Sequence, residues 1–186
     1  MNAPIDVTDI RIETPRLILR PWEDTDLDDL FAYASVDGVG QMAGWLPHKD
    51  MEESRRILDM FIREKKTLAL ELKETGKVIG SLGIEENDYD HIGPDRLGRE
   101  IGYVLSKMYW GRGLMPEAVS AVIRYCFVEL KYDYLLCGHF PRNDRSRRVI
   151  EKCGFRYLKE ILHTTRYETQ ERTLLYVLYN PKEDVK

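Results

Sequence analysis

The chain has 186 residues, of which 43% are hydrophobic and 32% are charged, and its formal net charge is −4. These values predict one soluble globular domain over residues 1–186, long enough to bury a sizeable core. The acidic balance argues against general nucleic-acid binding, which needs a basic surface. No apolar run approaches the roughly 20 residues of a membrane span, and the first residues lack the pattern of a signal peptide. We therefore expect a cytoplasmic protein with neither a membrane nor a nucleic-acid partner.

The cysteines indicate neither a disulfide framework nor a metal centre. Cys126, Cys137 and Cys153 make an odd number, and each lies within an apolar pattern. Their spacing does not match a paired metal-binding motif. We expect three reduced core cysteines and no bound metal.

The hydrophobic pattern predicts a mixture of strands and helices along the chain. Strands are expected over 17–22, 67–73, 77–86, 98–106, 132–140, 156–167 and 172–180, and helices over 24–36, 51–66, 117–130 and 143–155. Residues 74–76 would close a hairpin, whereas 38–50 and 87–98 are expected to be loops. Hairpins combined with one strand–helix–strand crossover predict an α/β fold with a mixed sheet.

The most informative segment is 109–118, where a glycine turn separates a strand from a helix. Gly111 and Gly113 permit a sharp backbone turn, and Pro116 and Glu117 suit the first turn of a helix. Free N–H groups at such a helix start bind anions, most often phosphate. The alternative is an ordinary strand-to-helix turn. The segment matches neither GxxxxGK[ST] nor GxGxxG, which argues against a nucleotide kinase or a dehydrogenase.

Three stretches, 14–29, 100–118 and 143–155, together resemble the GNAT N-acetyltransferase superfamily, in the branch of the RimJ/RimL ribosomal-protein N-terminal acetyltransferases. The resemblance implies a mostly antiparallel central sheet, flanked by helices and splayed at an acetyl-CoA site. It also implies transfer of an acetyl group from acetyl-CoA to a primary amine, on a protein N-terminus or a small molecule. The alternative is a module that binds acyl-CoA without catalysis.

By this resemblance, residues 110–115 bind the acetyl-CoA pyrophosphate. They are Trp110, Gly111, Arg112, Gly113, Leu114 and Met115. Trp110 replaces a polar residue of the family motif, and Met115 replaces a small one, which we expect to narrow the loop. The resemblance also implies that Tyr103, Val104 and Leu105 present backbone groups to the pantetheine arm, at an edge splayed at Gly102.

The thioester end and the proton transfers are also assigned by resemblance. Asn143 and Ser146 match the N-x-x-S of the branch, and Ser146 would protonate the departing thiolate. Ser146 would also fit a capping role in the first turn of its helix. Glu100 is the preferred base or water-positioning group, with a surface ion pair as its alternative. His139 is the second candidate base, with a structural role as its alternative.

The acceptor site is expected in the loops 38–50 and 87–98 and in the final hairpin. Trp45, His48, Tyr89 and Tyr167 are candidates to line it, and Asp88 or Glu85 to attract a cationic amine; each also fits an ordinary loop residue. The basic residues Arg112, Arg147, Arg148 and Lys152 are candidates to meet phosphates, although the three on the last helix are more simply a solvated face. A homodimer through the late strands is a further expectation from the resemblance.

Overall fold

The computed structural model describes residues 1–87, 92–93 and 95–181. Its strands are β1 (Ile12–Glu13), β2 (Leu17–Pro21), β3 (Thr67–Leu72), β4 (Lys77–Glu85), β5 (Gly98–Leu105), β6 (Tyr134–His139), β7 (Arg156–Thr164) and β8 (Gln170–Tyr179). Its helices are α1 (Leu27–Ala34), α2 (Met51–Glu64), α3 (Leu114–Val128) and α4 (Asp144–Lys152), with short 3-10 turns η1 (Asp24–Asp26), η2 (Gly40–Ala43) and η3 (Lys107–Tyr109).

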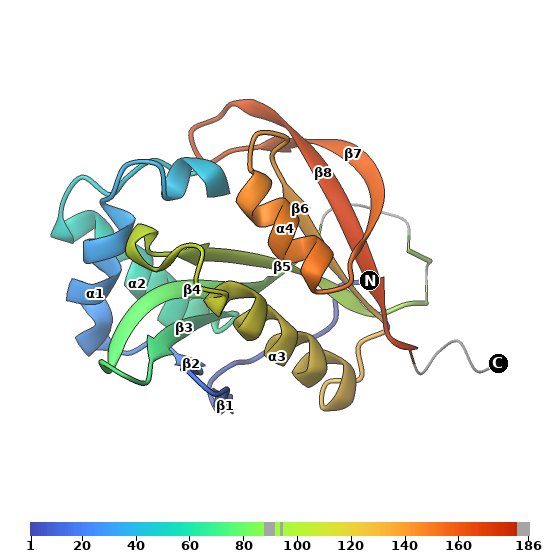
Figure 1. Ribbon diagram of the computed structural model, residues 1–186, viewed down its shortest axis with the longest axis horizontal. Helices are drawn as coiled ribbons and strands as arrows, with labels where there is room; N and C mark the ends of the chain where they lie inside the picture. Colours follow the sequence, from blue (N-terminus) through green and yellow to red (C-terminus); the bar gives the residue numbers. More distant parts are fainter. Residues whose placement is uncertain (88–91, 94, 182–186) are drawn as a thin grey trace.

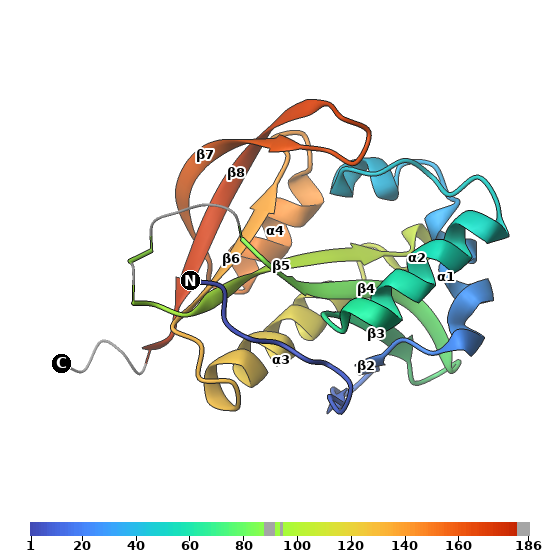
Figure 2. The same ribbon diagram turned by 180° about the vertical axis from the view of Figure 1, so that it is seen from behind.

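The eight strands form one open sheet in the order β1-β2-β3-β4-β5-β6-β8-β7. Every neighbouring pair is antiparallel except β5 and β6, which are parallel and are joined through α3. Helices cover both faces: α3 and α4 lie in front of the sheet in Figure 1, and α2 crosses the opposite face in Figure 2. The expected α/β fold with a mixed, mostly antiparallel sheet flanked by helices is confirmed.

Alternation along the strands divides the core between the two faces. Leu68 and Leu70 of β3 belong to the larger apolar cluster, which includes the buried side of α3. Ala69, between them, belongs to a second cluster with residues of α1 and α2, such as Leu30 and Leu58. A sheet that is buried on both faces positions its central strands rigidly, and β5 is one of these.

Most predicted elements are present, but some boundaries differ from the prediction. The helix predicted from residue 117 begins at Leu114, because Gly113 adopts the left-handed conformation and directly precedes it. Pro116 is accommodated in the first turn, where its missing N–H would have no intrahelical acceptor. The helix predicted over 24–36 consists of η1 followed by α1, and η2 interrupts the predicted loop 38–50.

The three cysteines are free. Cys126 and Cys137 are buried, and Cys153 is half-buried. Burial raises the pKa of the Cys126 thiol to about 12, so this side chain is a protonated core residue at neutral pH. Among the described residues, no helix is long and apolar enough to cross a membrane, and no group of His, Cys, Asp and Glu side chains is arranged to hold a metal ion.

Candidate acetyl-transfer site

The central strands separate at one end of the sheet. The β5–β6 ladder pairs Gly98, Arg99 and Glu100 with residues 134–136, and beyond Glu100 no pair continues it, although both strands extend further. Each strand keeps its outer partner, since β5 stays paired with β4 and β6 with β8. One backbone edge of β5 is therefore open from Ile101 onward. We call this opening the β5–β6 split.

The split includes Gly102, where the edge of β5 was expected to be splayed. On its other side, Gly102 pairs with Gly83 in an uninterrupted β4–β5 register, so β5 has no bulge there. The strands diverge where their parallel pairing ends, at Glu100. Gly102 instead leaves the sheet face bare, because a Cβ there would meet no atom within 4 Å.

The glycine loop lies between β5 and α3. Gly111 and Gly113 have φ values of +77° and +75°, a region that is costly for residues with a Cβ. Leu114 and Met115 open α3, so their N–H groups have no acceptor within the helix. These features give the loop the form of an anion cradle.

Trp110, which replaces the polar residue of the family motif, anchors this loop to β5 and α4. Its indole N–H donates to the carbonyl of Leu105 at 2.7 Å, and the Arg145 guanidinium lies 4.4 Å from the ring centroid. Met115 does not narrow the cradle as expected. Its side chain is only 5% exposed and packs in the main core.

Arg16 and Glu117 form a clamp that sequence reasoning did not identify. The Arg16 side chain donates to Glu117 at 2.7 Å and to the carbonyl of Arg112 at 2.9 Å, and Glu117 also accepts from the Thr14 hydroxyl at 2.6 Å. Burial opposes ionisation of Glu117, but the bonds from Thr14 and Arg16 outweigh it and lower its pKa. The clamp ties the β1–β2 turn to the glycine loop. Its signal was the 14–16 stretch, which contributed to the resemblance without an assigned role.

Three candidate residues meet across the split. The Tyr103 hydroxyl of β5 lies 2.9 Å from the Ser146 hydroxyl of α4. Asn143 accepts from the Ser146 N–H at 3.2 Å as the N-cap of α4, and its amide donates to the carbonyl of Met42 at 3.3 Å. Burial raises the pKa of Tyr103 well above its ordinary value, so its hydroxyl stays protonated. The contact between the Tyr103 side chain and Ser146 was not predicted, because only the Tyr103 backbone had been considered.

Glu100 lies on the opposite face of β5 from Tyr103, because the two are an odd number of residues apart. Its carboxylate approaches Gly138 of β6, where an added Cβ would lie 3.5 Å from Oε1. Val104 shares the face of Glu100 and packs in the cluster beneath α1 and α2. The base and acid candidates thus lie on opposite sides of the split strand.

His139 is buried in a setting that favours a structural role. Its Nδ1 lies 2.8 Å from the carbonyl of Phe140, and its ring packs on Tyr176. Among the basic candidates, Arg147 pairs with Asp144 and Glu151 on its own helix, and Arg148 and Lys152 are exposed. These contacts favour the solvated-face interpretation of α4. Arg112 is exposed beside the Tyr109 ring.

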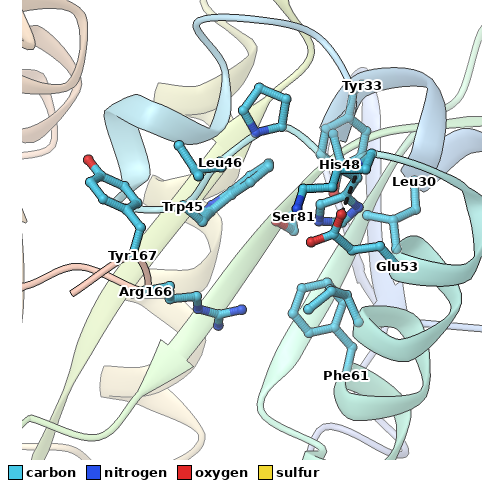
Figure 3. A pocket seen from close by; sticks show the side chains of 14 residues that line it. Leu30, Tyr33, Trp45, Leu46, His48, Glu53, Phe61, Ser81, Arg166 and Tyr167 are labelled. Carbon is cyan, nitrogen blue, oxygen red and sulfur yellow. Dashed lines mark hydrogen bonds between the residues drawn. The ribbon is translucent and has the colours of Figure 1, made fainter. Parts of the chain in front are cut away.

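A pocket of about 230 Å³ lies on the Glu100 face, between α1, the 38–50 loop, α2 and the β7–β8 turn. Trp45, His48 and Tyr167 line it, as expected for an acceptor groove, and Figure 3 shows them with Ser81 of β4. His48 is buried, and its Nδ1 forms a hydrogen bond with the Ser54 hydroxyl at 2.7 Å. Burial lowers the pKa of His48.

The remaining acceptor candidates are Glu85, Asp88 and Tyr89. The Glu85 carboxylate forms a salt bridge with the Lys66 ammonium group, with an N–O distance of 2.9 Å. Glu85 does not line the pocket. Asp88 and Tyr89 lie outside the described residues.

Comparison with known proteins defines the class. The family model of the acetyltransferase (GNAT) domain, which describes the sequences of that family, matches residues 16–156 of this chain. The chain therefore belongs to the GNAT acetyltransferase family. It is 29% identical over 180 residues to the uncharacterized N-acetyltransferase YoaA of Bacillus subtilis, covering 92% of this chain and 98% of that protein.

The resemblance to the ribosomal-protein branch is also confirmed, at greater distance. The [ribosomal protein uS5]-alanine N-acetyltransferase of Escherichia coli is 32% identical over 65 residues, covering 33% of this chain and 34% of that protein. A GNAT-family acetyltransferase from Bacillus anthracis has the same fold, with a TM-score of 0.78, 22% identity, and coverage of 92% of this chain and 99% of that one.

Proposed function

We propose that this protein is an acetyl-CoA-dependent N-acetyltransferase that acts by direct attack of an amine on the thioester. The observation that carries the proposal is the β5–β6 split, which is bordered by the glycine loop and by the Tyr103–Ser146 pair. Residues 110–115 would bind the pyrophosphate through backbone N–H groups, and Tyr103, Val104 and Leu105 would bind the pantetheine arm from the open strand edge. The exposed glycines and the unsatisfied N–H groups at the start of α3 suit that anion.

In the proposed reaction, the neutral amine attacks the acetyl carbonyl carbon, so that an N–C bond forms and the C–S bond breaks. Glu100, directly or through water, receives the proton lost by the amine, and Ser146 donates a proton to the departing thiolate. Backbone N–H groups near Tyr103 and Val104 stabilise the oxyanion. The location of Glu100 and Ser146 on opposite sides of β5 supports this division, because the amine approaches the carbonyl carbon from one direction and the thiolate leaves in another.

The test is release of free thiol from acetyl-CoA with a panel of amines that spans amino acids, polyamines, aminoglycosides and short peptides. We expect turnover with at least one class, and Glu100→Gln should lower kcat and flatten the alkaline-rising limb of the pH–rate profile. Tight acetyl-CoA binding without thiol release for any amine would contradict an enzyme and support the binding module. An unchanged pH profile would remove Glu100 from the mechanism.

A further inference from the structure

The pocket on the Glu100 face has a size and a chemical character that restrict the acceptor. Its volume of about 230 Å³ is below the roughly 300–1,000 Å³ of pockets for drug-sized ligands. Its walls include Leu30, Trp45, Leu46, Ile57 and Phe61. These apolar walls suit a single aromatic or branched aliphatic group.

The charge at the pocket is mainly positive. Arg166 and Lys49 line it, and Glu53 is the only carboxylate among its lining residues. The Glu53 carboxylate already accepts from the Lys49 backbone N–H at 2.7 Å. A polycation would therefore meet two like charges and one engaged carboxylate.

Arg166 is held in place by its backbone while its guanidinium stays available. Its N–H donates to the carbonyl of Gly44 at 2.8 Å, which fastens the β7–β8 turn to the 38–50 loop. In Figure 3 its side chain points into the space bounded by Trp45 and Phe61. Within the part of the chain that the structure describes, this guanidinium forms no salt bridge. A free guanidinium at an apolar pocket is suited to a carboxylate, which it binds through two parallel hydrogen bonds.

The pocket adjoins the acetyl-transfer site through two connections. Ser81, in its lining, is paired with Val104 at the open part of β5. The loop that supplies Trp45 also supplies Met42, whose carbonyl accepts from Asn143 beside Ser146. These two connections place the pocket next to the open part of β5.

We propose that the acceptor is a small amine that carries both a carboxylate and one apolar group, as an aromatic or branched aliphatic amino acid does. Arg166 binds the carboxylate, and the apolar walls bind the side group. The amine nitrogen forms the new N–C bond as the thioester C–S bond breaks, and the nitrogen loses a proton. This assignment rests on the proposed acetyltransferase activity and selects one substrate class for it.

The experiment compares aromatic amines with and without the carboxylate, and adds a polyamine as a contrasting acceptor. Thiol release is measured with phenylalanine, phenylalaninamide, phenethylamine and spermidine at saturating acetyl-CoA. We expect kcat/KM for phenylalanine to exceed that for phenylalaninamide by about tenfold or more, the size of one charged hydrogen-bonded contact. Arg166→Gln should bring this ratio close to one, because the acid loses more rate than the amide does. The matched control is Arg172→Gln on the same hairpin, since Arg172 is paired with Glu160 at 2.7 Å, and it should keep the wild-type ratio.

A binding measurement separates recognition from catalysis. Calorimetric titration with 3-phenylpropanoate should show binding to the wild type and to Arg172→Gln, and about tenfold weaker binding to Arg166→Gln. Equal rates for acid and amide, a preference for spermidine, or an unchanged ratio in Arg166→Gln would overturn this assignment while leaving the acetyltransferase proposal supported. Thiol release with none of the amines in the wider panel would contradict both.

Discussion

At the residue scale, the proposed acetyl-CoA site depends on the left-handed glycines of the loop. Gly111 and Gly76 have similar positive φ values, and a Cβ at either would meet no atom within 4 Å. They differ in place, because Gly76 lies in the β3–β4 turn, away from the glycine loop. Matched substitutions at Gly111 and Gly76 therefore distinguish the effect of backbone strain from the loss of acetyl-CoA binding.

We predict that Gly111→Val and Gly76→Val each lower the free energy of unfolding by about 1–2 kcal/mol, the cost of a left-handed residue with a Cβ. Only Gly111→Val should weaken acetyl-CoA binding, by at least about tenfold, because its side chain would occupy the face that the phosphates approach. Urea unfolding and calorimetric titration measure the two effects. Equal acetyl-CoA affinity in both variants would contradict the cradle.

Ser146 and Tyr103 present two hydroxyls at one place, and a pair of substitutions separates their roles. If Ser146 protonates the thiolate, Ser146→Ala lowers kcat by roughly 10²-fold or more with little change in the KM for acetyl-CoA. Tyr103→Phe removes the hydroxyl that contacts Ser146 but leaves the Ser146 hydroxyl in place, so it should cost less. Single-turnover thiol release measures both. A larger loss in Tyr103→Phe than in Ser146→Ala would transfer the acid role to Tyr103.

At the element scale, the clamp of Arg16 and Glu117 holds the start of α3 against the β1–β2 turn. Glu117 has its pKa lowered below the ordinary value of 4.5, so the ionised form is the one that the fold stabilises. The contribution of Glu117 to stability is therefore complete above that ordinary value and is lost as the pH falls through the folded pKa.

We predict that Glu117→Gln lowers the free energy of unfolding by about 1–3 kcal/mol at pH 7, because Arg16 and Thr14 lose a charged acceptor. The difference between variant and wild type should shrink in acid, where wild-type Glu117 is protonated. Urea unfolding at pH 7 and near pH 3 tests this. Glu13→Gln is a control, since Glu13 is an exposed carboxylate paired with Lys73. A difference that stays constant with pH would contradict the linkage.

At the scale of the whole molecule, the β5–β6 split divides the sheet into two parts. The parallel ladder between them consists of only three residue pairs, whereas the antiparallel ladders on either side are longer. A ligand bound in the split would contact β5 on one side and α4 on the other. Its binding free energy would then add to the stability of the whole sheet.

We predict that acetyl-CoA at 100 times its Kd raises the Tm by roughly 5–10 °C, which corresponds to about 2.7 kcal/mol for a domain of this size. The shift should be absent in Gly111→Val and retained in Gly76→Val. Differential scanning fluorimetry measures it. A full shift in Gly111→Val would contradict binding at the glycine loop.

The assembly of the molecule stays a prediction. The edge strand β7 exposes apolar side chains, among them Tyr157 and Leu162. Light scattering of the purified protein tests the homodimer expected from the family resemblance.

The sequence by itself determined the fold class and the position of the glycine turn before α3, because both depend on local patterns. Alternating and helical periodicities are set by neighbouring residues, and so is the left-handed turn at Gly111 and Gly113. It also identified Trp45, His48 and Tyr167 as candidates for one groove, since they lie in the loop and the hairpin where the acceptor site was expected.

Only the tertiary structure decided what depends on register and on contacts distant in sequence. The face of Glu100 follows from how β5 pairs with its neighbours, which alternation alone leaves open. Arg16 meets Glu117 about 100 positions away in sequence, and Tyr103 meets Ser146 only because β5 and α4 border the same split. Arg166 reaches the pocket because its backbone bonds Gly44 in a loop far from it in the chain. Such contacts arise from chain packing, so no local sequence pattern specifies them.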